Sequence, residues 1–238
     1  MLEPTTVGEV TLILLPGMDG TGDLFEPLLA ELGSSFKTQV VRYPSSEPLD
    51  YDALIAIARR GLPGAGPYMI LGESFSGPIA IRLASERPVG LAALILCASF
   101  VSNPIAWLPN LASLRGLVPI GLSARWFAPW KLMGRFRTPE RTALLLRTLA
   151  RVPDGVLRAR VRAAMAVNVS SQLAQVEVPI LYLQGTEDGL ITQRIVDAVR
   201  RSSPSMQVRP VVGPHCLLQC SAPEAAREIR EFALRLNA

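Results

Sequence analysis

The sequence predicts an α/β fold in which a six-stranded parallel sheet is flanked by helices. Short apolar runs rich in Val, Ile and Leu alternate along the chain with longer amphipathic runs. Most of the apolar runs lack the every-second-residue alternation of half-exposed strands, which is typical of parallel strands buried on both faces. A length of 238 residues with 49% hydrophobic residues is enough for a large core and excludes an intrinsically disordered chain.

The strands and helices follow one another in regular order. We expect strands at residues 10–15, 38–43, 68–71, 91–97, 180–184 and 207–212. We expect helices at residues 24–32, 51–61, 76–87, 192–201 and 222–236. The last helix has the clearest pattern, because Ala225, Ile229, Phe232 and Leu236 fall on one face. Such strand–helix–strand units connect right-handedly and build a parallel sheet with helices on both sides.

Residues 101–170 differ from the rest of the chain in composition. They contain eleven basic and two acidic residues, a net charge of +9, whereas the remainder carries 13 basic and 18 acidic residues, a net charge of −5. All three tryptophans, Trp107, Trp126 and Trp130, also lie there. We therefore expect residues 1–100 and 171–238 to form the core and residues 101–170 to form an inserted module.

The inserted module is expected to be a helical lid after the fourth strand. The sequences Thr138-Pro139-Glu140 and Pro153-Asp154-Gly155 are typical of helix starts, since Pro suits the first turn and Thr suits the N-cap. The earlier half, residues 103–129, gives no clear pattern.

Four loops should meet at one edge of the sheet, because the carboxyl ends of parallel strands form the binding edge of such folds. The first strand is followed by Pro16-Gly17-Met18-Asp19-Gly20 and the third by Gly72-Glu73-Ser74-Phe75-Ser76-Gly77. The fifth is followed by Gly185-Thr186-Glu187-Asp188 and the sixth by Gly213-Pro214-His215. Serine, aspartate and histidine are therefore expected to converge from separate loops.

These residue types suit nucleophilic catalysis. Ser74 lies between a strand and a helix with small residues around it, as a sharp turn requires. A serine hydroxyl needs a base, and His215 is the only histidine in the chain. Asp188 would hold the imidazole tautomer, and the order Ser, Asp, His is that of α/β-hydrolases. Glu187 lies next to Asp188 and stays open as the alternative acid.

With these motifs the chain resembles the α/β-hydrolase family over nearly its whole length, and specifically its small lidded serine esterases. The resemblance implies Ser74 as nucleophile, Asp188 as acid and His215 as base. It implies an oxyanion hole formed by the backbone N–H groups of Met18 and Phe75. Two positions depart from the family: Ser76 replaces the last Gly of Gly-x-Ser-x-Gly, and Pro16 replaces His in the first loop.

Each of these residues also has a purely structural interpretation. Ser74 could be a helix N-cap, and His215 could be a core histidine. Cys216 and Cys220 are interpreted as buried packing residues. No His, Cys and Asp cluster has the spacing of metal ligands, and Gly-Met-Asp-Gly-Thr-Gly is not a dinucleotide-binding loop. We therefore expect neither a metal nor a cofactor.

The arginines and tryptophans of the module leave the partner open. The arginines are either a solvated surface or a cationic collar for an acidic carrier protein, coenzyme A or anionic lipid. The tryptophans Trp107, Trp126 and Trp130 would line an apolar acyl pocket. No motif combines aromatic and basic residues for nucleic acid.

The compartment is predicted from three further observations. The longest apolar run, residues 91–101, is too short to cross a membrane. The first residues lack a signal-peptide pattern. The three cysteines are odd in number and form no CxxC motif, which favours free thiols and the cytoplasm.

The function predicted from sequence is a carboxylesterase that cleaves small-molecule acyl esters through an acyl-enzyme. A thioesterase or an acyl-carrier-protein methyl-ester esterase would use the same triad, so the fold does not separate them. A non-catalytic binding protein with a hydrolase fold is the alternative from another class.

Overall fold

The described part of the chain contains one sheet of six parallel strands. The computed structural model describes residues 10–104 and 122–236, except for the side chains of residues 122–126. The strands are β1 (Thr11–Leu15), β2 (Lys37–Val40), β3 (Tyr68–Glu73), β4 (Leu91–Cys97), β5 (Ile180–Gly185) and β6 (Gln207–Val211). They lie in the order β2-β1-β3-β4-β5-β6, and every neighbouring pair is parallel. This confirms the predicted sheet.

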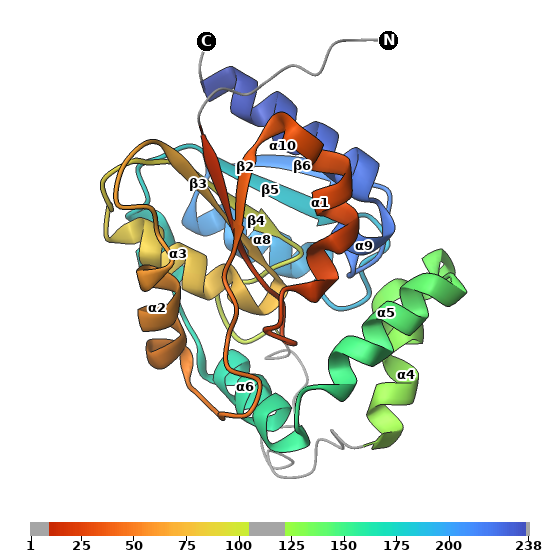
Figure 1. The fold of residues 1–238 in the computed structure, drawn as a ribbon. Coiled ribbons are helices and arrows are strands. Elements are labelled where there is room, and N and C mark those ends of the chain that lie inside the picture. Colours follow the sequence, from red (N-terminus) through yellow and green to blue (C-terminus); the bar gives the residue numbers. More distant parts are fainter. Residues whose placement is uncertain (1–9, 105–121, 237–238) are drawn as a thin grey trace, which may run out of the picture.

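Helices cover both faces of the sheet (Figure 1). One layer holds α1 (Glu26–Leu32), α9 (Leu217–Cys220) and α10 (Ala222–Leu236). The other layer holds α2 (Tyr51–Arg60), α3 (Gly77–Ser85), α7 (Ser170–Ala174) and α8 (Gln193–Ser202). Short 3-10 turns are η1 (Asp23–Phe25), η2 (Gly33–Ser35), η3 (Ser74–Ser76) and η4 (Gly134–Phe136).

Both faces of the sheet are apolar, which is why the central strands are continuous hydrophobic runs. In β1, Ile13 and Leu15 pack into the core beneath α2 and α3, whereas Leu12 and Leu14 pack into the core beneath α1 and α10. All four side chains are fully buried. Alternate residues of a strand point to opposite faces, so two separate cores demand an apolar residue at every position.

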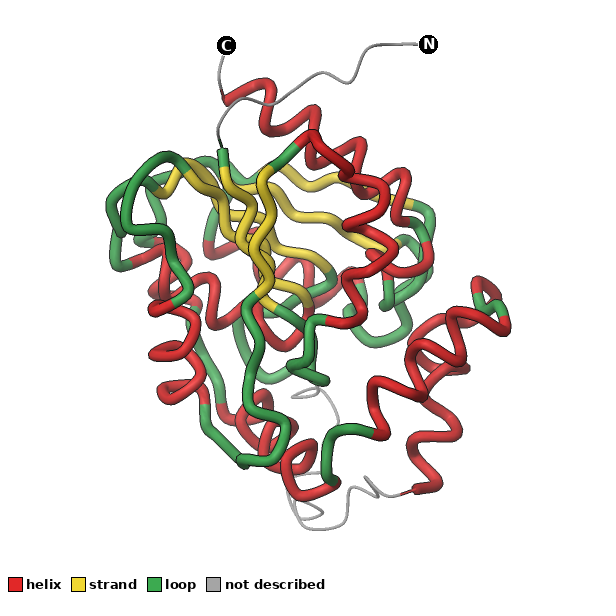
Figure 2. Tube along the Cα trace, in the orientation of Figure 1, coloured by secondary structure: helices red, strands yellow, loops and turns green. Residues whose placement is uncertain are grey.

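The helices α4 (Leu122–Met133), α5 (Pro139–Ala150) and α6 (Asp154–Ala166) are inserted between β4 and β5. In Figure 2 they lie beyond the carboxyl ends of the strands, with α4 and α5 side by side. As predicted, α5 begins after Thr138, whose hydroxyl accepts a hydrogen bond from the Arg141 N–H, and α6 begins after Pro153. The insertion therefore lies against the edge of the sheet at which the four loops meet.

The structure differs from the expected elements at several points, including the second strand and the short helices α7 and α9. The second strand ends at Val40 and not at residue 43, because the chain turns away there and the Tyr43 N–H donates to the Gly20 carbonyl. The four-residue helix α9 was not expected, since one turn is too short to show a helical period. Within the described ranges, no helix has the length and apolar character needed to cross a membrane.

Candidate active site

Ser74 occupies a sharp turn between β3 and α3. Its φ angle is 46°, in the left-handed region that non-glycine residues rarely adopt. Glycines on either side of Ser74 allow the backbone segments of the turn to approach each other closely. A Cβ at Gly72 would lie 2.8 Å from the Ser76 carbonyl oxygen, and one at Gly77 would overlap Ser99 Oγ. Bulkier residues at these two positions would therefore push the turn apart.

Ser76 replaces the usual glycine of this turn and takes part in the site through its hydroxyl. Its side chain is fully buried. The Ser76 hydroxyl donates to the Pro16 carbonyl and lies 2.8 Å from the Tyr43 hydroxyl. Serine is thus accommodated sterically, and it ties the turn to the loop that follows β1.

The structure brings Ser74, His215 and Asp188 into one hydrogen-bonded chain. Ser74 Oγ lies 2.9 Å from His215 Nε2, and His215 Nδ1 lies 2.8 Å from Asp188 Oδ2. The other Asp188 oxygen accepts hydrogen bonds from the N–H groups of Leu190 and Ile191 at 2.7 and 2.8 Å. These bonds fix the carboxylate, whose side chain is only 1% exposed.

The loops that carry Asp188 and His215 are bonded to each other. The Glu187 N–H donates to the Gly213 carbonyl at 2.9 Å. A Cβ at Gly185 would lie 2.6 Å from the Pro214 carbonyl oxygen, so glycine is needed where the loops touch. The two loops therefore hold the acid and the imidazole together.

Glu187 bonds to a different partner from Asp188. Its carboxylate forms a bidentate ion pair with Arg135 of η4 at 2.5 and 2.8 Å. The Arg135 guanidinium lowers the pKa of Glu187. Of the two adjacent acids, Asp188 contacts the histidine and Glu187 contacts the insertion.

The loop after β1 lines the same cavity as Ser74 and carries the Met18 N–H, one of the two oxyanion donors expected from the sequence. The Gly20 N–H donates to the Gly17 carbonyl at 3.1 Å, and the Gly20 carbonyl accepts from Tyr43. Among the residues that the structure describes, none accepts from the N–H of Met18. Phe75 follows Ser74 within η3, and its carbonyl accepts from the Tyr51 hydroxyl at 2.9 Å.

A cavity of about 350 Å³ opens at Ser74 and His215. Its walls are mostly apolar and come from both the core and the insertion. The core supplies Met18, Leu24, Phe100, Leu190 and Ile191, while α5 and α6 supply Leu145, Leu149, Leu157 and Val161. Such a cavity suits the hydrocarbon part of a small ligand.

Glu73, directly before Ser74, carries a buried carboxyl group, and it was not singled out from the sequence as a functional residue. Burial, with a further contribution from Asp19, raises its pKa to about 7, against the Gln219 and Gly17 hydrogen bonds that lower it. Gln219 Nε2 donates to Glu73 at 3.0 Å. The signal was available, because an acid at the end of a strand buried on both faces cannot reach bulk water.

Arg160 of α6 is a second functional candidate that was not expected from the sequence. Its side chain is fully buried and donates to the Met18 and Asp19 carbonyls at 2.9 and 2.7 Å. Val156, Arg160 and Ala164 are buried at four-residue spacing, so the arginine interrupts the apolar stripe of its helix. That interruption was the one sequence signal that could have distinguished Arg160.

The tryptophans predicted to line the acyl pocket are described only in part. Trp107 and the side chain of Trp126 lie outside the described residues. Trp130 is 64% exposed, and the Arg137 guanidinium stacks on its ring. Trp130 does not line the cavity, and leucines of α5 and α6 take up much of the inserted wall.

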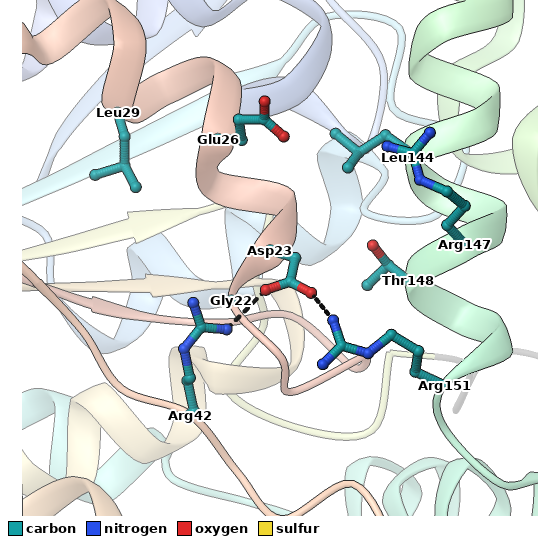
Figure 3. Close-up of a pocket in the computed structure, with 9 residues that line it drawn as sticks. All are labelled: Gly22, Asp23, Glu26, Leu29, Arg42, Leu144, Arg147, Thr148 and Arg151. Atoms are coloured by element: carbon teal, nitrogen blue, oxygen red, sulfur yellow. Dashed lines mark hydrogen bonds and ion pairs between the residues drawn. The ribbon is translucent and has the colours of Figure 1, made fainter.

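Several arginines of the insertion bind groups of the protein itself. Figure 3 shows Asp23 of η1 between Arg42 and Arg151, the latter directly after α5. Arg147 lines the same hollow of about 500 Å³. Together with the Arg135–Glu187 pair, these contacts hold the insertion against the core.

The three cysteines are free and buried. Cys216 lines the cavity and packs with Leu24, Met133 and Leu145, and burial raises the pKa of its thiol. A thiol in that state is a packing group and not a nucleophile. In residues 10–104 and 122–236 no group of three His, Cys, Asp or Glu side chains could hold a metal ion.

Comparison with known proteins places the chain in a family. The family model described as serine aminopeptidase, S33, matches residues 45–217, a span that contains Ser74, Asp188 and His215. The chain belongs to this family of α/β-hydrolases. No curated protein sequence matches the chain.

Solved structures with the same fold carry several different activities. An enol-lactonase from Burkholderia xenovorans is 14% identical, with a TM-score of 0.79 over 94% of this chain and 91% of that one. A thermophilic esterase from Thermogutta terrifontis is 20% identical, with a TM-score of 0.76 over 98% and 92%. A proline iminopeptidase from Mycobacterium smegmatis is 20% identical, with a TM-score of 0.68 over 95% and 90%. At these identities the likeness shows the fold alone.

Proposed function

We propose that the protein is a carboxylic ester hydrolase with Ser74 as nucleophile, His215 as base and Asp188 as the acid that orients the imidazole. The observation that carries this proposal is the continuous hydrogen-bonded chain from Ser74 Oγ through His215 to Asp188 at the mouth of the cavity. The coarser assignment, a hydrolase fold with esterases among its structural neighbours, supports it.

In the proposed reaction the Ser74 oxygen attacks the ester carbonyl carbon while His215 Nε2 takes the hydroxyl proton. The carbonyl oxygen becomes an oxyanion, which accepts hydrogen bonds from the N–H groups of Met18 and Phe75. The imidazolium then protonates the departing alcohol as the C–O bond breaks. Water, deprotonated by His215, attacks the acyl-enzyme, releases the acid and restores Ser74.

The cavity supports an ester with a medium-sized apolar acyl group. Its walls are largely side chains of Leu, Ile, Val, Met and Phe, and polar groups gather beside Ser74. Residues 101–170 would act as the lid, because α5 and α6 supply one wall. A closed apolar wall excludes water and strengthens the hydrogen bonds to the oxyanion.

The test is hydrolysis of a series of p-nitrophenyl esters of increasing acyl length by the native chain, Ser74→Ala and His215→Ala. We expect turnover in the native chain, with an optimum at medium length, and a loss of about 10³-fold or more in either variant. Undiminished activity of Ser74→Ala would overturn the mechanism, and an inactive native chain would favour a binding protein.

The matched control for the serine change is Ser171→Ala. Ser171 is an exposed residue of α7, and its hydroxyl bonds to the side chain of the neighbouring Gln172. Surface substitutions of this kind change little, so turnover should stay within about twofold of the native value.

A thioester or a carrier-bound methyl ester would use the same three side chains. The basic insertion is the feature that would favour an acidic carrier or coenzyme A, but several of its arginines are bonded within the protein. Turnover of an acyl-CoA alongside the neutral esters separates the two. If acyl-CoA turnover falls steeply as the salt concentration rises, the acyl-CoA docks on those arginines of the insertion that are not bonded within the protein.

A further inference from the structure

Arg160 is a charged side chain enclosed by the protein. It lies on α6, is 0% exposed, and donates three hydrogen bonds to backbone carbonyls. Nη1 donates to Met18 and Asp19 at 2.9 and 2.7 Å, and Nη2 donates to Pro44 at 2.9 Å. Nε is buried without a hydrogen-bond partner among the described residues. A buried cation whose donors are only partly satisfied is costly, so the arrangement requires a compensating benefit.

The carbonyls that Arg160 holds belong to the loop that carries the proposed oxyanion donor. The Gly17 carbonyl, which shares its peptide group with the Met18 N–H, accepts from Gly20. Arg160 fixes the next two carbonyls along the chain. The peptide groups on both sides of Met18 are thereby held, while no described residue accepts from its N–H and Met18 lines the same cavity as Ser74.

The loop is shaped around the guanidinium. A Cβ at Gly20, where φ is 72°, would lie 2.6 Å from Arg160 Nη1. Burial lowers the pKa of Arg160, whereas the negative charge of Asp19 in the same loop favours its charged form. The loop that follows β1 and the Arg160 guanidinium are thus complementary in shape and in charge.

We propose that Arg160 is a positioning residue that holds the Met18 N–H in place for the oxyanion. The inference rests on the proposed function and deepens it, because it makes the oxyanion hole depend on a helix of the insertion. The insertion is then part of the catalytic apparatus as well as a cover for the acyl group.

The test compares Arg160→Met and Arg160→Lys with the control Arg162→Met, which changes an exposed arginine on the same helix. We expect Arg160→Met to lower kcat on p-nitrophenyl esters about 10²-fold with KM within about threefold, the size of losing one oxyanion donor. Arg160→Lys should recover about tenfold of that loss, because an ammonium can still donate to the same carbonyls. Arg162→Met should stay within about twofold of the native chain.

An inhibitor that resembles the intermediate separates positioning from a general loss of structure. A trifluoromethyl ketone forms a tetrahedral anion on a serine, so its inhibition constant should rise in parallel with the loss in kcat/KM across the Arg160 variants. A raised KM with unchanged kcat and an unchanged inhibition constant would overturn the proposal.

A second readout does not depend on turnover. Hydrogen exchange of a peptide covering residues 16–22 should be about tenfold faster in Arg160→Met, with an intermediate rate in Arg160→Lys and with β4 and α3 unchanged. The proposal would be overturned if Arg160→Met kept the kcat of the native chain per folded molecule, or if hydrogen exchange in this loop were unchanged. Either result would do so even if the variant unfolds at a lower temperature. The proposed function fails separately, when the native chain is inactive or Ser74→Ala keeps full activity.

Discussion

The core and the insertion use charged residues in different ways. In the core, Asp188, His215 and Glu73 lie at strand ends, where parallel topology gathers them. In the insertion, Arg135 and Arg160 reach across to the core and bond to it. The arginines of a charge-rich segment can therefore serve to bind that segment to the rest of the protein. A high net charge alone does not identify a surface at which a partner docks.

The largest expected effect separates the two acids that follow β5. Asp188→Asn should lower kcat on the order of 10⁴-fold, because an amide cannot stabilise the imidazolium and favours the wrong tautomer. Glu187→Gln should change kcat less than about threefold, since Glu187 forms an exposed pair with Arg135. Steady-state hydrolysis of one p-nitrophenyl ester measures both. Equal losses in the two variants would contradict the division between core and insertion.

The sheet and the loops that carry Ser74, Asp188 and His215 were predictable because each depends on local sequence. Runs such as residues 91–97 are apolar throughout, and Ser74 directly follows a strand. The choice of Asp188 over Glu187 came from the resemblance to α/β-hydrolases and not from local sequence, since the two are neighbours and their partners, His215 and Arg135, lie far along the chain. A contact of that separation leaves no local pattern.

A smaller effect is expected from the buried carboxyl of Glu73. Its pKa of about 7 exceeds the ordinary 4.5, so the folded state binds the proton more tightly than the unfolded state. Its favourable contribution is complete below the ordinary pKa and is lost as the pH rises through the folded value. Relative to Glu73→Gln, the native chain should lose on the order of 2–3 kcal/mol of unfolding free energy between about pH 4.5 and 8.5.

Urea unfolding of both proteins at several pH values measures this difference. A constant gap between Glu73→Gln and the native chain across the range would show that Glu73 binds its proton equally in the folded and unfolded states. The control Glu224→Gln, which changes an exposed acid at the start of α10, should show no such trend.

The smallest expected effect comes from the ion pairs that fasten the insertion. Asp23→Asn removes the shared partner of Arg42 and Arg151, whose side chains are 59% and 65% exposed. Exposed pairs contribute little, so the free energy of unfolding should fall by about 0.5–1 kcal/mol, and by less in about 1 M salt. Chemical denaturation at low and high salt measures this change.

The matched change within the core is Asp52→Asn, which removes the Arg82 pair between α2 and α3. Its effect should be of similar size, because that pair is also at the surface. A loss above about 2 kcal/mol for Asp23→Asn alone would show that this pair does more than an ordinary surface contact.

Arg160 shows why the remainder of the site resists prediction. The sequence places it among eleven basic residues of the insertion. Its partners are the carbonyls of residues 18, 19 and 44, and a carbonyl has no residue-specific signature. The burial of its helix face, which depends on docking against the core, distinguishes it from Arg162.

The φ angle of Ser74 limits which substitutions can be used to make this protein more stable. Three non-glycine residues of the described ranges, Ser74, Arg87 and Ala98, have φ between 46° and 53°. Glycine relieves such backbones, but at Ser74 it would remove the hydroxyl of the proposed nucleophile. Arg87 sits on the surface just after α3, where a salt bridge to Glu177 would be given up. A glycine that raises the stability of the fold can therefore be introduced at Arg87, whereas the strained turn at Ser74 has to be kept for the proposed reaction.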